Sequence, residues 1–133
     1  MGEDITTVNV AKFRLERAKQ DLEDAKLCYE NNRFLVANNR AYYSIFHAIR
    51  AVLALEKIDF KRHKDVIAYF NQYFVKTEKF PRKIGKKITQ AKTIREDSDY
   101  DDEFNADAEK TKQQMETASE LIKLVEEYIS KNL

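Results

Sequence analysis

The residues best suited to chemistry lie within residues 39–50, where polar side chains interrupt an apolar helical run. Arg40 and His47 are seven residues apart, almost two turns of an α-helix, so their side chains point the same way. Tyr43 and Ser44 lie between them on that face. Because polar groups on a mostly buried helix need partners, this stripe predicts either an internal hydrogen-bond network or a functional site.

Arginine and histidine at this spacing suit chemistry on a phosphate. The guanidinium of Arg40 can bind an anion through two hydrogen bonds, and the imidazole of His47 titrates near neutral pH. In RNA cleavage the histidine would take the proton of the 2′-hydroxyl or protonate the leaving oxygen, a contribution of about 10²–10⁴-fold. The alternative is structural, with the tyrosine hydroxyls and His47 satisfying one another inside the protein. The residues alone leave both interpretations open.

Seven Lys and Arg residues between positions 76 and 92 form a second candidate site, and Glu78 is the acidic residue among them. Spacings of four residues gather their charge on the outer side of one helix, which favours a nucleic-acid surface. The alternative is a solvated helix face balanced by acidic residues elsewhere, since few aromatic side chains are interleaved for base stacking. The residues predicted to contact nucleic acid are Lys79, Arg82, Lys83, Lys86 and Lys87.

Two further features are weaker. His63 precedes a predicted helix, where it either caps that helix, faces solvent or lines a pocket beside His47. Residues 96–103 are rich in carboxylates, which could hold Mg²⁺, but no fixed ligand spacing accompanies them. We therefore expect a solvated turn there, no metal site and no cofactor.

Helices must position these residues, because the apolar side chains recur with the spacing of three and four residues that marks a helix face. The pattern predicts helices over residues 8–30, 33–57, 64–75 and 105–130. Another begins near Pro81, whose missing amide hydrogen suits a first turn. The helix over 33–57 is the most apolar and is expected at the centre, and residues 96–103 are expected to be a loop or frayed turn. These elements predict an all-α, up-and-down antiparallel bundle of about five helices.

The composition agrees with one helical domain over residues 1–133. The chain is 43% hydrophobic and 35% charged, with two glycines and one proline, too few turn residues for a β-rich fold. Its length suffices to bury one hydrophobic core. The single cysteine, Cys28, excludes an internal disulfide and a zinc site built on cysteines. Since neither a signal peptide nor a long apolar span is visible, we expect a cytoplasmic protein that does not enter a membrane.

The net charge of +1 conceals a strong segregation of charge. Residues 31–95 carry 15 Lys and Arg against 4 Asp and Glu, whereas residues 96–133 carry 4 against 12. The basic centre could attract the acidic end within one molecule or between two subunits. It could also bind an anionic partner such as RNA.

Several blocks of the sequence, in order, resemble small prokaryotic proteins of the HEPN domain family. The first block is residues 39–53, Asn-Arg-Ala-Tyr-Tyr-Ser-Ile-Phe-His-Ala-Ile-Arg-Ala-Val-Leu. The later blocks are His63 with Val66 and Ile67, then residues 74–80, and finally Arg95 with residues 98–101. The similarity covers roughly residues 8–130.

The resemblance implies an up-and-down helical bundle, often a homodimer, commonly encoded beside a minimal nucleotidyltransferase. Some of these pairs act as toxin and antitoxin. In the ribonuclease members, an arginine and a histidine that follows it by about four to six residues act without a metal in a cleft between two subunits. Arg40 and His47 match the outer limit of that spacing. Ala41 departs from the polar residue usual after the arginine, and the pair lies on the second helix rather than a late one.

Two functional hypotheses follow. The favoured one is a HEPN module of a toxin–antitoxin-like pair that binds a nucleotide, RNA or a nucleotidyltransferase partner through the groove of Arg40 and His47. The other is a metal-independent endoribonuclease that works as a homodimer, with His47 as acid or base and Arg40 on the phosphate. The further residues expected to contact the ligand are Tyr43, Ser44, Arg50, His63, Arg95 and Tyr100.

Overall fold

The structure of the protein, a computed structural model, describes residues 5–100 and 108–133, apart from the side chains of residues 98–100. These residues form five α-helices and no β-strand. The helices are α1 (Ile5–Glu30), α2 (Phe34–Leu55), α3 (His63–Phe70), which continues as a π-helical turn η1 (Asn71–Val75), α4 (Arg82–Tyr100) and α5 (Ala108–Lys131). The predicted all-α bundle of five helices is confirmed.

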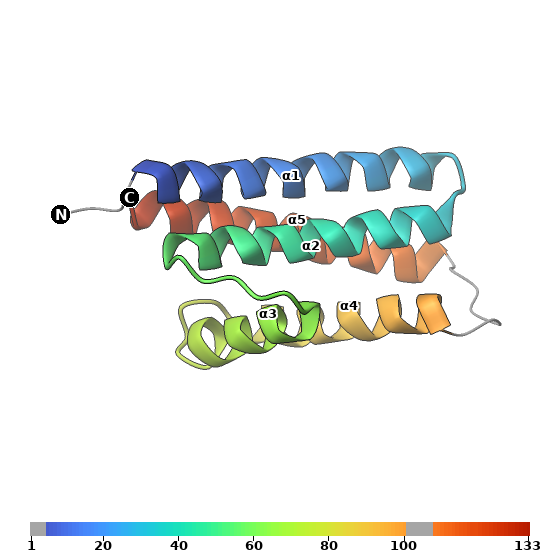
Figure 1. Cartoon of the computed structure of the whole chain (residues 1–133). Helices are drawn as coiled ribbons and strands as arrows, with labels where there is room; N and C mark the ends of the chain where they lie inside the picture. The colour runs from blue at the N-terminus through green and yellow to red at the C-terminus, as the bar shows by residue number, and fades with distance from the viewer. Residues whose placement is uncertain (1–4, 101–107) are drawn as a thin grey trace.

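Helices α1, α2 and α5 pack together, and α3, η1 and α4 lie along one side of this group (Figure 1). Residues 56–62 run back along α2, so that α3 begins beside the middle of α2, where His63 stacks on Phe46. Helix α3 therefore runs in the same direction as α2, and α4 returns beside it. This return brings side chains from α2, α3 and α4 to one place.

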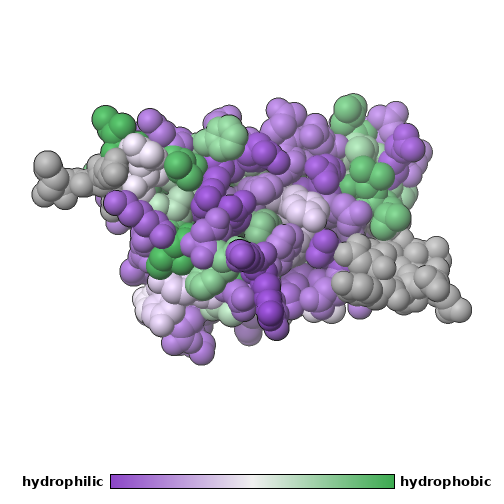
Figure 2. Space-filling view, viewed as in Figure 1, coloured by the Kyte–Doolittle hydropathy of each residue, from purple (hydrophilic) through white to green (hydrophobic). Residues whose placement is uncertain are grey.

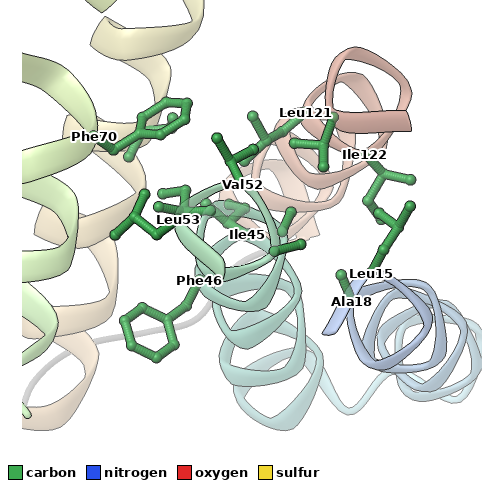
Figure 3. Packing of buried hydrophobic residues seen from close by; sticks show 14 of the residues in the cluster. Leu15, Ala18, Ile45, Phe46, Val52, Leu53, Phe70, Leu121 and Ile122 are labelled. Atoms are coloured by element: carbon green, nitrogen blue, oxygen red, sulfur yellow. The ribbon is translucent and has the colours of Figure 1, made fainter. Parts of the chain in front are cut away.

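Helix α2 occupies the centre of the bundle, as its apolar sequence predicts, with 14 of its 22 residues buried. In Figure 3, Ile45 and Val52 point toward α1 and α5, while Phe46 and Leu53 point toward the side of α3 and α4. Full burial of one such aliphatic or aromatic side chain stabilises a fold by about 1.5–3 kcal/mol. The packing on both sides therefore fixes the orientation of α2, and with it the direction of its polar stripe.

Three boundaries differ from the predictions. Helix α1 begins at Ile5 rather than near residue 8, and the second half of the predicted third helix is π-helical. The prediction of a loop from residue 96 was wrong, because α4 continues to Tyr100. Lys92 pairs with Glu96 at 2.9 Å one turn further along α4, which offsets the charge that was expected to end the helix. The rest of the acidic run lies outside the described residues.

No helix in residues 5–100 and 108–133 combines the length and the apolar character that crossing a bilayer requires.

Candidate functional site

Three helices bring most of the predicted ligand-binding residues together. Arg40, Tyr43, His47 and Arg50 come from α2, His63 from α3, and Arg95 from α4. The contacts that join them run through the aromatic rings of Tyr42, Tyr43 and Phe46. We call this set the site cluster: Arg40, Tyr43, His47, Arg50, His63 and Arg95.

His63 lies in the cluster next to Tyr43 and Phe46. Its ring stacks on Phe46 with the centroids 3.8 Å apart and 23° between the planes. Its Nδ1 lies 3.4 Å from the hydroxyl of Tyr42, and the ring of Tyr43 meets it edge-on at 5.8 Å. Burial, and then the charges of Arg95 and Arg50, lower the pKa of His63. The half-buried imidazole is therefore held by aromatic contacts.

Two guanidinium groups approach the ring of Tyr43. The Cζ of Arg40 lies 5.3 Å from the ring centroid and that of Arg95 lies 5.6 Å from it. Arg95 also donates a hydrogen bond of 3.3 Å to the Tyr43 hydroxyl and lies over the ring of Tyr42 at 5.1 Å. Contacts of this kind are worth about 0.5–1 kcal/mol each at exposed sites. They hold two positive charges around one tyrosine.

Asp21, on α1, joins Arg40 to His47 and was missed by the sequence analysis. Its carboxylate lies 3.7 Å from Nη1 of Arg40 and 3.7 Å from Nε2 of His47. Asp21 is only 5% exposed, and its Oδ2 has no hydrogen-bond partner in the part of the chain that the structure describes. Its signal in the sequence is its position on the inner face of the first predicted helix, three residues after Ala18, where an apolar residue is expected.

The electrostatic surroundings keep His47 uncharged at neutral pH. Burial first, and then the neighbouring positive charges of Arg17, Arg50 and Arg14, lower the pKa of His47 to about 4. Burial raises the pKa of Asp21, against the opposing effects of Arg40 and Arg17. The separation of 3.7 Å from Asp21 is too long for a hydrogen bond. His47 and Asp21 are therefore a neutral ring beside a carboxylate rather than an ion pair.

Arg50 is held at the edge of the cluster by Asp59. Its Nε and Nη2 donate to the two carboxylate oxygens at 3.3 and 2.8 Å. Arg14 donates to the Arg50 carbonyl oxygen at 3.2 Å and lies 3.4 Å from Oδ2 of Asp59. Burial acts against ionisation, but the hydrogen bonds from Arg50 and the Phe60 amide hold the pKa of Asp59 below its usual range. Arg50 therefore supports the cluster with much of its charge already compensated.

Two predicted residues are not part of the cluster. Ser44 is fully buried, and its hydroxyl donates a hydrogen bond of 2.6 Å to the carbonyl oxygen of Ala18. This contact joins α2 to α1 and leaves Ser44 no surface for a ligand. Tyr100 ends α4, and its side chain lies outside the described residues.

The cations of the second candidate site lie in and beside the first half of α4 and divide into different environments. Lys87 forms an ion pair of 2.7 Å with Glu120 that joins α4 to α5. Lys79 lies over the ring of Phe74 at 5.2 Å. Arg82 is 3.9 Å from Glu78 at the surface, and Lys83 and Lys86 are exposed. The predicted basic surface is present on α4, but Lys87 is occupied within the bundle.

The site cluster suits an anionic ligand with a planar group. Arg40 has a side chain that is 41% exposed, so a solvent-borne phosphate can reach it. The cluster also contains the aromatic rings of Tyr43 and His63, the kind of side chain on which unpaired bases stack. In the described ranges, His, Cys, Asp and Glu side chains form no group of three or more that would hold a metal ion. The chemistry available to the cluster is phosphate binding and proton transfer by imidazole.

Comparison with known proteins identifies a family for nearly the whole chain. Residues 11–128 match the family model of the HEPN domain. A "UPF0332 protein" from Thermotoga maritima is 32% identical over 120 residues, which are 90% of this chain and 91% of that protein.

Two similar proteins from Methanocaldococcus jannaschii carry a functional name. "Putative toxin MJ0605" is 36% identical over 86 residues, 65% of this chain and 64% of that protein. "Putative toxin MJ0142" is 31% identical over 87 residues, 65% of this chain and 59% of that protein. More than a third of each of these two proteins is therefore unmatched.

Proposed function

The chain belongs to the HEPN domain family, and we propose that it is a binding module that recognises RNA or a nucleotide through the site cluster. The observation that carries this proposal is the convergence of Arg40, His63 and Arg95 from three helices around the ring of Tyr43. Guanidinium groups recognise phosphate oxygens, and aromatic rings stack on unpaired bases.

The neighbouring acids support this assignment because they hold the arginine side chains of the cluster in place. Asp59 is engaged by Arg50 and Arg14, and Asp21 lies behind Arg40 and His47. The guanidinium groups of Arg40 and Arg95 remain around Tyr43. A phosphate bound there would gain two positively charged partners that are already held in place, which lowers the entropic cost of binding.

The biological setting that we propose is toxin-like. Two relatives are named as putative toxins, and a toxin in a cell is restrained by a partner in the toxin–antitoxin pair that we propose. We propose a minimal nucleotidyltransferase as that partner and a homodimer as the working unit. Apolar side chains exposed near both ends of α1 and α2 support self-association (Figure 2). They are Ile5, Val10 and Phe13 at one end and Leu27, Leu35 and Val36 at the other.

A second candidate function is metal-independent endoribonuclease activity. The observation that favours it is the presence of two imidazoles beside one tyrosine, with ring centroids of His47 and His63 at 6.3 and 5.8 Å from Tyr43. One imidazole can accept the proton of the 2′-hydroxyl while the other protonates the leaving oxygen. A pKa of about 4 makes His47 a weak base at pH 7, so binding comes first in our proposal.

One experiment separates the two functions. Single-stranded RNA is incubated in EDTA with the wild type, His47→Ala, Arg40→Gln and Arg33→Gln, and both binding and cleavage are measured. Arg33 is an exposed arginine immediately before α2 and outside the cluster, so its variant is a matched control for charge. We expect Arg40→Gln to weaken binding about tenfold, the loss of roughly one charge-assisted hydrogen bond, and Arg33→Gln to bind normally.

Cleavage by the wild type that disappears in His47→Ala would establish the ribonuclease. Equal binding by the wild type and Arg40→Gln, with both proteins folded by circular dichroism, would contradict the assignment of the cluster.

A further inference from the structure

An exposed groove between η1 and α4 is a second candidate site. Its volume is about 550 Å³, within the range of ligand pockets, and none of its lining residues belongs to the site cluster. The lining residues that matter here are Asn71, Val75, Lys76, Arg82, Gly85 and Lys86. The groove is therefore separate from the site cluster, and two of its lining residues, Arg82 and Lys86, also belong to the predicted basic surface of α4.

The floor of the groove is apolar because α4 approaches η1 closely at Gly85. A Cβ atom at this position would lie 2.7 Å from Cγ1 of Val75, closer than real contacts allow. Glycine permits this approach and leaves backbone and the Val75 side chain at the surface of the groove. The π-helical turn that carries Val75 is a rare conformation that often accompanies functional sites.

The rim of the groove is cationic. Lys76, Arg82 and Lys86 line it and are exposed. Lys76 donates to the amide oxygen of Gln72, and Arg82 is 3.9 Å from Glu78 in an exposed, weak ion pair. The rim therefore keeps a strong positive potential for an anionic partner.

Asn71, which lines the groove, also has a buried amide oxygen. Oδ1 of Asn71 is buried and has no hydrogen-bond partner in the part of the chain that the structure describes. Native proteins rarely leave a buried polar atom unpaired, because the desolvation is not compensated. This oxygen lies 3.4 Å from where a Cβ atom of residue 85 would be, so it belongs to the packing between η1 and α4 rather than to the surface of the groove.

These features favour a peptide over a nucleotide. Among the described residues that line the groove none is aromatic, so they offer no ring on which a base could stack. An aliphatic side chain fits the floor of Val75 and Gly85. We propose that the groove binds an acidic peptide segment of a partner protein, with carboxylates on Lys76, Arg82 and Lys86 around one aliphatic side chain.

A displayed library of random peptides tests this proposal on the full chain. Selection on the wild type is followed by counter-selection against the double variant Arg82→Gln with Lys86→Gln. Lys79→Gln with Lys83→Gln is the matched control, since it removes the same charge near the start of α4 outside the groove lining. We expect the selected peptides to carry acidic residues flanking Leu, Ile or Val. The groove variant should bind these peptides at least tenfold more weakly than the wild type does, and the control variant should bind them normally.

Nuclear magnetic resonance locates the selected peptide. The side-chain amide of Asn71 and the backbone N–H of Gly85 are expected to shift, and Asn71→Asp is expected to weaken binding because its carboxylate repels the ligand. The His47→Ala variant should bind the peptide normally, which separates this site from the proposed RNA site. A neutral or basic consensus, no enrichment, or equal loss in the two double variants would overturn the proposal. Displacement of the peptide by single-stranded RNA at the same resonances would instead assign the groove to nucleic acid.

Discussion

At the scale of single residues, the burial of His47 makes the stability of the fold depend on pH. In the unfolded chain its imidazole has a pKa near 6.5, whereas burial and the surrounding arginines hold the folded value at about 4. As the pH falls below 6.5, the unfolded state therefore binds a proton before the folded state does. The free energy of unfolding must then decrease.

We predict that the free energy of unfolding falls by about 2 kcal/mol between pH 7.5 and pH 5.0 through His47 alone, given these pKa values. His63, whose pKa is also lowered, acts in the same direction. Asp21 has a raised pKa and acts in the opposite direction, because its folded form gains the proton first. Urea denaturation at the two pH values measures the sum, and His47→Gln should lose most of the dependence.

Asp21→Asn is the control for this assignment. It removes the opposing contribution, so its stability should fall more steeply than that of the wild type as the pH decreases. A proton titration of His47 with a midpoint near 6.5, or an unchanged pH dependence in His47→Gln, would contradict the prediction.

Sequence reasoning could find the cations and imidazoles of the site but not the acid that joins two of them. The stripe of Arg40, Tyr43 and His47 follows from the period of the helix alone. Asp21 contacts this stripe from another helix, and the contact depends on how α1 is rotated against α2. Ser44 looked equally suitable by residue type, yet its hydroxyl is used by the carbonyl oxygen of Ala18.

At the scale of helices and turns, the spacing of apolar residues along the sequence predicted the helical fold well. The inward residues of α1, α4 and α5 are those that the spacing of three and four indicates, because one face of each helix packs on the core. The direction of α3 could not be predicted in this way. Residues 56–62 turn the chain back along α2, and His63 then stacks on Phe46, a contact between residues on separate elements.

The contact of α4 with η1 gives a prediction at this scale. Replacing Gly85 by Ala improves helix propensity by about 0.8–1 kcal/mol. The new methyl group, however, would lie 2.7 Å from Cγ1 of Val75, a stiff β-branched side chain. Overpacking of this kind costs typically about 1–3 kcal/mol, so we expect Gly85→Ala to lower the free energy of unfolding by about 1 kcal/mol.

Combining Gly85→Ala with Val75→Ala identifies the cause. Once the valine methyl groups are removed, the added methyl group has space, and Gly85→Ala should stabilise the Val75→Ala protein. Urea denaturation of the four proteins gives the coupling energy. Simple additivity of the two substitutions would show that the close approach at Gly85 does not limit the packing.

At the scale of the whole molecule, ion pairs within the bundle compensate only part of the positive charge of residues 31–95. Lys87 pairs with Glu120 and Lys92 with Glu96, contacts that join the basic centre to the acidic end. Lys79, Lys83 and Lys86 remain exposed. Lys87 is therefore a poor position for testing RNA binding, because its replacement by Glu would also place two carboxylates together between α4 and α5.

Lys79 and Lys83 provide the cleaner test of whether α4 extends the RNA surface. Affinity for single-stranded RNA decreases with salt, and each phosphate contact contributes a slope of about −0.7 in a plot of log K against log salt concentration. If both lysines contact phosphates, Lys79→Gln with Lys83→Gln should flatten that slope by about 1.4. Fluorescence anisotropy between 50 and 300 mM salt, roughly the range over which such slopes are measured, gives the value.

Lys112→Gln with Lys123→Gln removes the same charge from exposed positions on α5 and should leave the slope unchanged. This control is needed because net charge alone alters the long-range attraction of RNA. If both double variants shift the affinity equally at low salt and neither changes the slope, the α4 lysines act only through the overall field. Phosphate contacts would then be confined to the site cluster, where Arg40→Gln alone should flatten the slope by about 0.7.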